Sequence, residues 1–113
     1  MRPIPDKLRK KLSNMPHMAQ CSWCTIKSNL EWHHAILYSG RQLNEWYAII
    51  ALCRQCHRGE FGTLRAEIKD FCEMLAITRG LEDLTKKYPK RDWVWEKQWL
   101  EQKVKKHVID KKI

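Results

Sequence analysis

Apolar residues near the start of the chain recur every three or four positions, with basic residues between them. The apolar positions are Ile4, Leu8, Leu12 and Met15. Because an α-helix completes a turn every 3.6 residues, these side chains share one face. The segment 1–20 is therefore expected to form a basic amphipathic helix, entered through two prolines.

The pattern changes to strict alternation from Leu30 to Ala35. Successive side chains of a strand point to opposite faces, so His33 and His34 are expected on different sides of the sheet. A second apolar run with β-branched residues extends from Tyr47 to Leu52 and reads as a buried strand. Ser39-Gly40 marks a loop between the two runs, and together they predict a hairpin.

Helical spacing returns after the second strand. One helix is expected up to Gly80, with apolar positions at Leu64, Ile68, Phe71, Cys72 and Leu75. A last helix is expected from about Asp92 to about Val108. The fold class is thus α+β: a small core over residues 21–62, preceded by the helix of 1–20 and followed by helices within 63–113.

Tryptophans lie on two sides of the predicted last helix. One stripe contains Trp93, Leu100, Val104 and Val108 and is expected to face the core. Trp95 and Trp99 lie nearly opposite, with Lys106 close by and Lys103 at the edge. Either both sides pack inside the protein, or the second side contacts a partner, such as a second copy in a homodimer or a nucleic acid on which indoles stack.

A chain of 113 residues is expected to form one domain with a modest core, and small cores usually need a staple. No apolar run approaches the roughly 20 residues of a membrane span, and the N-terminus has no apolar run typical of a signal peptide. No membrane partner is therefore expected. The expected location is the cytoplasm, where thiols stay reduced and paired cysteines favour metal over disulfides.

Four of the five cysteines form two Cys-x-x-Cys pairs, Cys21/Cys24 and Cys53/Cys56, with 28 residues between the pairs. This gap exceeds the 15–20 residues of a simple zinc ribbon, but it fits a hairpin inserted between the pairs. Four thiolates complete a tetrahedral zinc shell with no open position, so the sequence predicts a structural Zn²⁺. The remaining Cys72 lies in a helical pattern and is expected to be a buried, inert thiol.

The segment from Cys53 to His57 also matches the Cys-x-x-Cys-His motif of haem c attachment. Attachment of that kind normally requires export, and no export signal is visible. It would also leave Cys21 and Cys24 unexplained. Zinc is the better interpretation.

The net charge of +9 is concentrated in the flanks: residues 1–20 carry +4, 21–79 carry +1 and 80–113 carry +4. A basic chain of this size suits a polyanionic partner, most simply nucleic acid, although a solubilising lysine excess would look similar. The candidate nucleic-acid contacts are Lys7, Arg9, Lys10, Lys11, Arg41, Arg54, Arg58, Lys103 and Lys106.

Three histidines stand in register with the cysteine pairs: His33 and His34 near the end of the first strand, and His57 directly after the second pair. From Cys21 to about Gly62 the chain resembles the HNH (ββα-metal) nucleases of the zinc-containing type. Their pattern is a cysteine pair, an Asp-His or His-His at a strand end, a loop, a second strand, and Leu-Cys-x-x-Cys-His opening a helix. The size is similar to that of compact phage and prophage HNH endonucleases.

The resemblance implies a DNA endonuclease, acting in the cytoplasm of a bacterial host if the chain is phage-encoded. By position, His34 matches the general base, and His33 and His57 match ligands of a catalytic divalent ion such as Mg²⁺. Histidine suits a base that works near neutral pH, and a divalent cation suits the phosphate and leaving oxygen.

One position departs from the family pattern. Ala48 occupies the place of the middle asparagine, which normally orients the base histidine. Asn44 and Glu45 are the nearest polar residues that could brace the base instead. The alternative function is therefore a non-catalytic or weakly catalytic, zinc-scaffolded DNA-binding or adaptor protein.

Overall fold

The computed structural model describes residues 4–59 and 64–112, with side chains described only to residue 106. It shows a small protein of mixed helix and sheet. In chain order the elements are α1 (Asp6–Ser13), η1 (Pro16–Met18), β1 (Leu30–His34), β2 (Leu37–Tyr38), β3 (Arg41–Gln42), η2 (Trp46–Ala48), β4 (Ile49–Cys53), α2 (Arg54–Arg58), α3 (Ala66–Lys87) and α4 (Trp93–Lys112).

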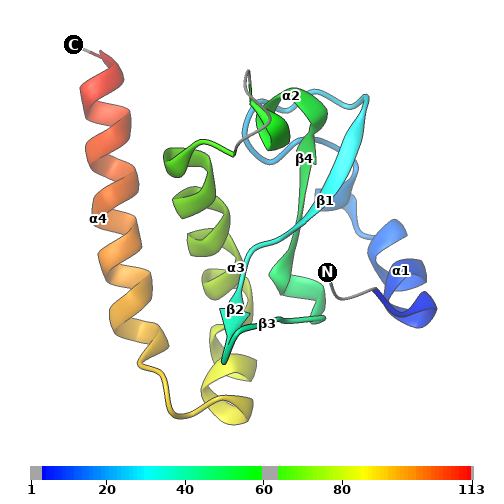
Figure 1. Cartoon of the computed structure of the whole chain (residues 1–113), viewed down its shortest axis with the longest axis vertical. Helices are drawn as coiled ribbons and strands as arrows, with labels where there is room; N and C mark the ends of the chain where they lie inside the picture. The colour runs from blue at the N-terminus through cyan, green and yellow to red at the C-terminus, as the bar shows by residue number, and fades with distance from the viewer. Residues whose placement is uncertain (1–3, 60–63, 113) are drawn as a thin grey trace.

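The two strands β1 and β4 pair antiparallel, as the alternating pattern predicts (Figure 1). Leu30 lies opposite Cys53 and His34 opposite Ile49, so the histidines are at one end of the ladder and the cysteines at the other. Every residue of β4 is buried, which explains why its sequence is continuously apolar instead of alternating.

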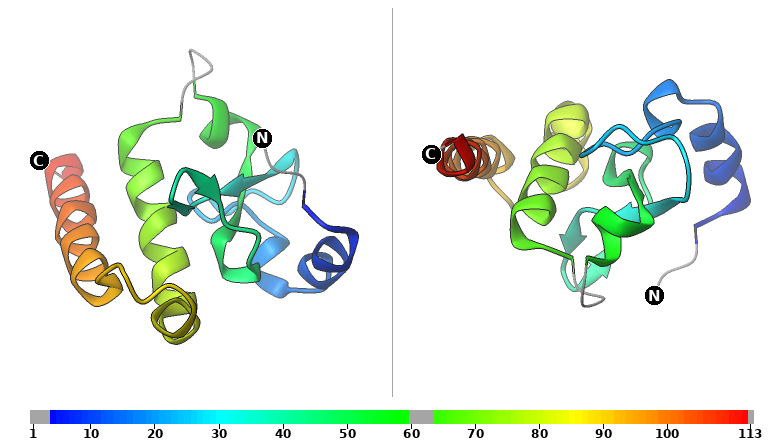
Figure 2. Two further views of the ribbon diagram at one scale, coloured as in Figure 1. Left: turned by 60° about the horizontal axis from the view of Figure 1, so that its bottom comes forward. Right: turned by 90° about the horizontal axis from the view of Figure 1, so that it is seen from above.

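Both faces of β4 are covered because helices lie on either side of the hairpin. Seen from above, α4, α3, the hairpin and α1 follow one another in a row (Figure 2). Ile50 and Leu52 belong to the larger apolar core, which includes residues of α3 and α4. Ile49 and Ala51 belong to a smaller cluster with Leu12 of α1. Within the segment 1–20, which was expected to form one helix, α1 spans only Asp6–Ser13 and covers the second face of the hairpin.

The predicted helix end at Gly80 is wrong, because α3 continues through this glycine to Lys87. A Cβ built on Gly80 would lie 2.1 Å from Cδ1 of Tyr47, so the residue allows the close approach of a ring instead of ending the helix. The second strand also begins later than expected, at Ile49, because Trp46–Ala48 form a 3₁₀ turn.

The sequence did not predict the small ribbon of β2 and β3. Its turn is the Ser39-Gly40 pair, and both residues have positive φ angles of 52° and 76°. Such a pair with two left-handed residues matches the twist of a two-stranded ribbon. Within the part of the chain that the structure describes, no helix is both long enough and apolar enough to cross a membrane.

Candidate metal centre and histidine cluster

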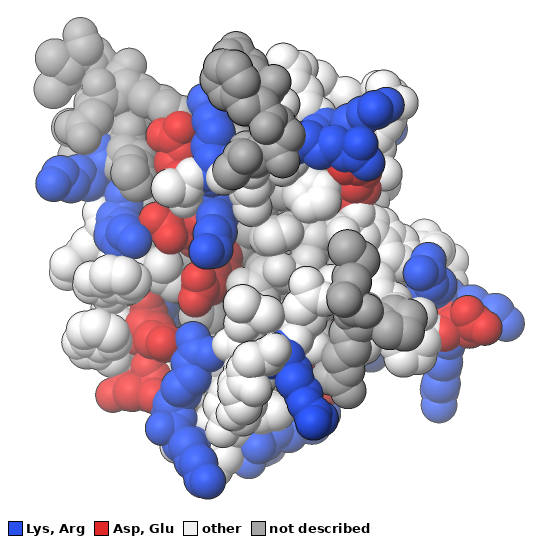
Figure 3. Space-filling model, in the orientation of Figure 1, with Lys and Arg blue, Asp and Glu red and all other residues white. Residues whose placement is uncertain are grey.

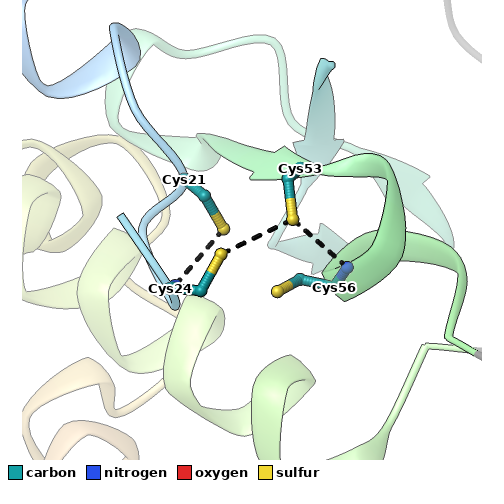
Figure 4. A group of neighbouring side chains, drawn as sticks. All are labelled: Cys21, Cys24, Cys53 and Cys56. Carbon is teal, nitrogen blue, oxygen red and sulfur yellow. Dashed lines mark hydrogen bonds between the residues drawn. The ribbon is translucent and has the colours of Figure 1, made fainter. Parts of the chain in front are cut away.

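The sulfur atoms of Cys21, Cys24, Cys53 and Cys56 converge at one point, with all four within 4.8 Å of one another (Figure 4). The Sγ atoms of Cys24 and Cys53 are 3.6 Å apart. A disulfide would require about 2.05 Å, whereas four sulfurs around a tetrahedral zinc lie roughly 3.8 Å apart. The cluster could therefore hold a metal ion such as zinc.

Local structure brings each pair of thiols together. Cys21 begins a tight turn in which the backbone N–H of Thr25 donates to its carbonyl at 3.0 Å. Thr25 accommodates this turn with a φ of 68°. In the second pair, Cys53 ends β4 and its sulfur accepts the N–H of Cys56 at 3.5 Å, capping α2. The equivalent contact joins the N–H of Cys24 to the sulfur of Cys21, also at 3.5 Å.

The thiols of this cluster have unequal proton affinities. Burial opposes ionisation of Cys21, but backbone N–H groups, first that of Cys24, outweigh it and lower the pKa of Cys21 to about 6. Burial and the neighbouring thiols raise the pKa of Cys56 well above its usual range. Several thiolates cannot share so small a volume without a cation, and a divalent ion would remove the conflict.

His33 and His57 come together on one face of the hairpin, with ring centroids 5.4 Å apart. Burial, followed by charge interactions with His57, His34 and Lys69, lowers the pKa of His33 to about 4. His33 is therefore a neutral imidazole at pH 7, the form that binds metal ions.

Glu31 holds His57 in place. Its Oε1 accepts a hydrogen bond from Nδ1 of His57 at 2.9 Å, and Arg58 lies 2.7 Å from Oε2. The bond from His57, the largest cause, keeps the pKa of Glu31 below its usual range. In the neutral form of the His57 ring, Nδ1–H donates this hydrogen bond to the carboxylate, and Nε2 then carries the lone pair that can bind a ligand. Sequence reasoning assigned Glu31 no role, although strand alternation places it on the same face as His33.

His34 points to the other side, where its Nε2 lies 2.9 Å from Oδ1 of Asn44. An amide oxygen only accepts, so Nε2 carries the proton and Nδ1 of the neutral ring keeps a lone pair. Of the two residues expected near His34, Asn44 makes this contact, while Glu45 pairs with Lys87 at 3.3 Å. Ala48 is fully buried and touches the strand end through its backbone, whose carbonyl accepts the N–H of Ala35 at 2.8 Å.

Across the described residues, the four cysteines are the one group of at least three His, Cys, Asp or Glu side chains with ligand atoms within 4.8 Å. His33, His57 and Glu31 are neighbours that do not meet this criterion together. The fifth cysteine, Cys72, is fully buried as expected, and burial raises its pKa to about 12.

The basic residues singled out in the sequence differ in their surroundings. In Figure 3 Lys and Arg side chains are spread over the visible face, and acidic side chains lie among them. The α1 residues Lys7, Arg9, Lys10 and Lys11 are exposed, as are Arg41, Arg54 and Lys106. Among the described residues, two candidates form ion pairs: Arg58 with Glu31, and Lys103 with Asp70 at 3.1 Å.

Trp95 and Trp99 lie on the outer side of α4, whereas Trp93 and Leu100 are buried. Trp95 is 57% exposed and Trp99 47% exposed. Their rings stack, with centroids 6.0 Å apart and planes at 8°, and Nζ of Lys103 lies 4.2 Å from the Trp99 ring centre. These two side chains therefore do not pack inside the described part of the protein, and they leave this side of α4 open to solvent.

The chain was compared with protein-family models, curated proteins and solved structures, and no significant match was found in any of the three comparisons.

Proposed function

We propose that this protein is a metal-dependent DNA endonuclease of the HNH type, with β1, β4 and α2 as its ββα-metal core. One observation carries the proposal: two adjacent histidines face opposite sides of a strand end, and each has its own partner. His33 stands beside His57, and His34 is bonded to Asn44. This division gives a metal-binding side and a proton-accepting side, as hydrolysis of a phosphodiester requires.

His34 is the proposed general base. The bond from its Nε2–H to Asn44 leaves the lone pair on Nδ1, which can take a proton from a water molecule as that water attacks phosphorus. Asn44 thereby substitutes for the asparagine that the family pattern places at the position of Ala48. The same bond limits rotation of the ring, which keeps Nδ1 aimed in one direction.

His33 and His57 are the proposed ligands of a divalent ion such as Mg²⁺, with Glu31 orienting His57. When bound, the ion would stabilise negative charge on the phosphate and the leaving oxygen. Both imidazoles are suited to ligation: His33 is kept neutral by burial, and His57 presents Nε2 because Glu31 accepts its Nδ1–H. The cysteine cluster would hold the separate, structural Zn²⁺, since four thiolates leave no open position for substrate.

Plasmid nicking with Mg²⁺, Mn²⁺ or Ni²⁺ tests the proposal. Wild type should nick DNA, and His34→Ala should lower the rate by about 100-fold or more, since general bases typically contribute 10²–10⁴-fold. Mn²⁺ binding by His34→Ala should remain close to wild type. Leu37→Ala is the matched control, because Leu37 lies three residues on and its side chain is 58% exposed. Equal nicking by His34→Ala and wild type would refute the base assignment.

A second function is a non-catalytic, zinc-scaffolded DNA-binding protein. The observation that favours it is that, over the described residues, only the cysteines form a complete ligand group. This alternative predicts that wild type binds DNA but does not nick it with any of the three metals. Binding titrations run beside the nicking assay therefore separate the two functions.

A further inference from the structure

The helix α3 contacts the segment of residues 43–48 that leads into β4, here called loop 43–48, at two points. The ring of Tyr47 is buried against the Gly80 backbone, so closely that a Cβ on Gly80 would lie 2.4 Å from Cε1 of the ring. The hydroxyl of Tyr47 donates to Oδ2 of Asp83 at 2.6 Å. The Tyr47 side chain thus packs on α3 at Gly80 and forms a hydrogen bond with α3 at Asp83, one turn further along.

A second attachment lies one helical turn further along. Nζ of Lys87 donates to Oε1 of Glu45 at 3.3 Å and lies 3.4 Å from Oδ2 of Asp83. Positions 80, 83 and 87 fall on one face of a helix. Asp83 therefore links the two attachments, and α3 holds residues 45 and 47 at the same time.

Asn44, the hydrogen-bond partner of His34, directly precedes these two residues. Its bond to Nε2 of His34 is 2.9 Å long and would be lost beyond about 3.5 Å. A displacement of loop 43–48 by less than about 1 Å is therefore enough to break the bond. The other end of the loop is fixed to the strand end next to His34, where the carbonyl of Ala48 accepts the N–H of Ala35 at 2.8 Å.

We propose that α3 is the positioning element for His34: by holding Tyr47 and Glu45 it fixes Asn44, and Asn44 keeps the imidazole proton on Nε2. Tyr47, Asp83 and Lys87 are then positioning residues, distant from the reacting atoms. The catalytic meaning of this inference rests on the proposed function. Its structural content does not, since the location of the proton on His34 is measurable without any cleavage.

The test uses the full chain with ¹⁵N-labelled histidine. Tyr47→Phe removes only the hydroxyl and keeps the ring against Gly80. Above neutral pH, wild type should show the ¹⁵N shifts of an Nε2–H imidazole at His34, and Tyr47→Phe should show a mixture of both tautomers. In nicking assays kcat should fall about 10-fold with KM unchanged, the lower range for loss of a group that orients a functional side chain.

Two further variants separate positioning from a general loss of stability. Asp83→Ala should show the same mixture of His34 tautomers as Tyr47→Phe. Asp83→Asn keeps an oxygen that can accept the hydrogen bond from Tyr47, so it should show mostly the wild-type Nε2–H tautomer. Thr85→Val is the matched control, because Thr85 lies on α3 and its hydroxyl bonds only within the helix, to the carbonyl of Leu81.

The possible outcomes are distinct. Wild-type shifts and wild-type kcat in both Tyr47→Phe and Asp83→Ala would overturn the inference. If wild type does not cleave DNA, the proposed function fails, and a change of tautomer in Tyr47→Phe still supports the positioning role. If wild type cleaves and the tautomer is unchanged in both variants, the function stands and the positioning role is wrong.

Discussion

Replacing Gly80 by alanine should destabilise the protein, against the usual effect of this change in a helix. In an open helix interior Gly→Ala gains about 1 kcal/mol. Here the new Cβ would lie 2.1 Å from Cδ1 of Tyr47 and 2.4 Å from two further ring atoms. Ordinary contacts are about 3.5–4 Å, so the ring must retreat by more than about 1 Å.

The ring has little room to retreat, because Tyr47 is 1% exposed and its hydroxyl is bonded to the same helix. Overpacking typically costs about 1–3 kcal/mol and occasionally more. Since the overlap is severe, we expect a net loss of about 2 kcal/mol after the helix-propensity gain. For a chain of this size that is a Tm lower by about 8 °C.

Urea unfolding followed by circular dichroism measures this change. Thr78→Ala, at an exposed position of the same helix, is the control and should gain a few tenths of a kcal/mol from helix propensity. Tyr47→Leu in the Gly80→Ala background should recover part of the loss, because the smaller side chain relieves the overlap. A Gly80→Ala protein as stable as wild type, or more stable, would show that the close packing of Tyr47 on α3 has been misjudged.

Three other predictions concern the metal sites and α4. Native mass spectrometry should find one zinc ion per chain. Cys21→Ser should unfold the protein, because structural zinc supplies roughly 10 kcal/mol or more of apparent binding free energy. A wild-type protein that is folded without zinc would contradict this prediction. Glu31→Gln should weaken Mn²⁺ binding, measured by calorimetry, by about 10- to 100-fold. The control Glu82→Gln, which changes an 87% exposed side chain, should bind Mn²⁺ as wild type does. Equal Mn²⁺ affinities of Glu31→Gln and wild type would show that Glu31 does not support the site. Trp95 and Trp99 together expose roughly 250 Å² of surface. A stable dimer buries about 800 Å² on each partner, so analytical ultracentrifugation should show a monomer. A dimer that dissociates in Trp95→Ala would disprove this prediction.

The cysteine cluster and the hairpin were predictable because each depends on a local rule. Ligand chemistry requires two close pairs of thiols, so the spacing of Cys21, Cys24, Cys53 and Cys56 was enough to predict their convergence. Strand periodicity predicted that His33 and His34 would face opposite ways, and the register of β1 and β4 agrees.

What the sequence could not reveal depends on contacts between distant segments. Gly80 was read as a helix end because the ring that requires a glycine there belongs to Tyr47, far back in the chain. Glu31 looked like one acidic residue among many until the fold brought His57 and Arg58 to it. Asn44 and Glu45 were equivalent candidates in the sequence, and only the ion pair of Glu45 with Lys87 separates them.

The shortness of α2 has a consequence for chelation experiments. A helix of five residues does not persist alone in water. The helix α2 directly follows Cys53, whose sulfur caps it, and it contains Cys56. If the four cysteines hold zinc, removing it would melt this turn and carry His57 away from His33. Under the proposed function, a chelator that takes this zinc would abolish cleavage although zinc never touches the substrate. Inhibition by chelators would then not identify the proposed catalytic metal, and identifying it requires adding ions back while the zinc remains bound.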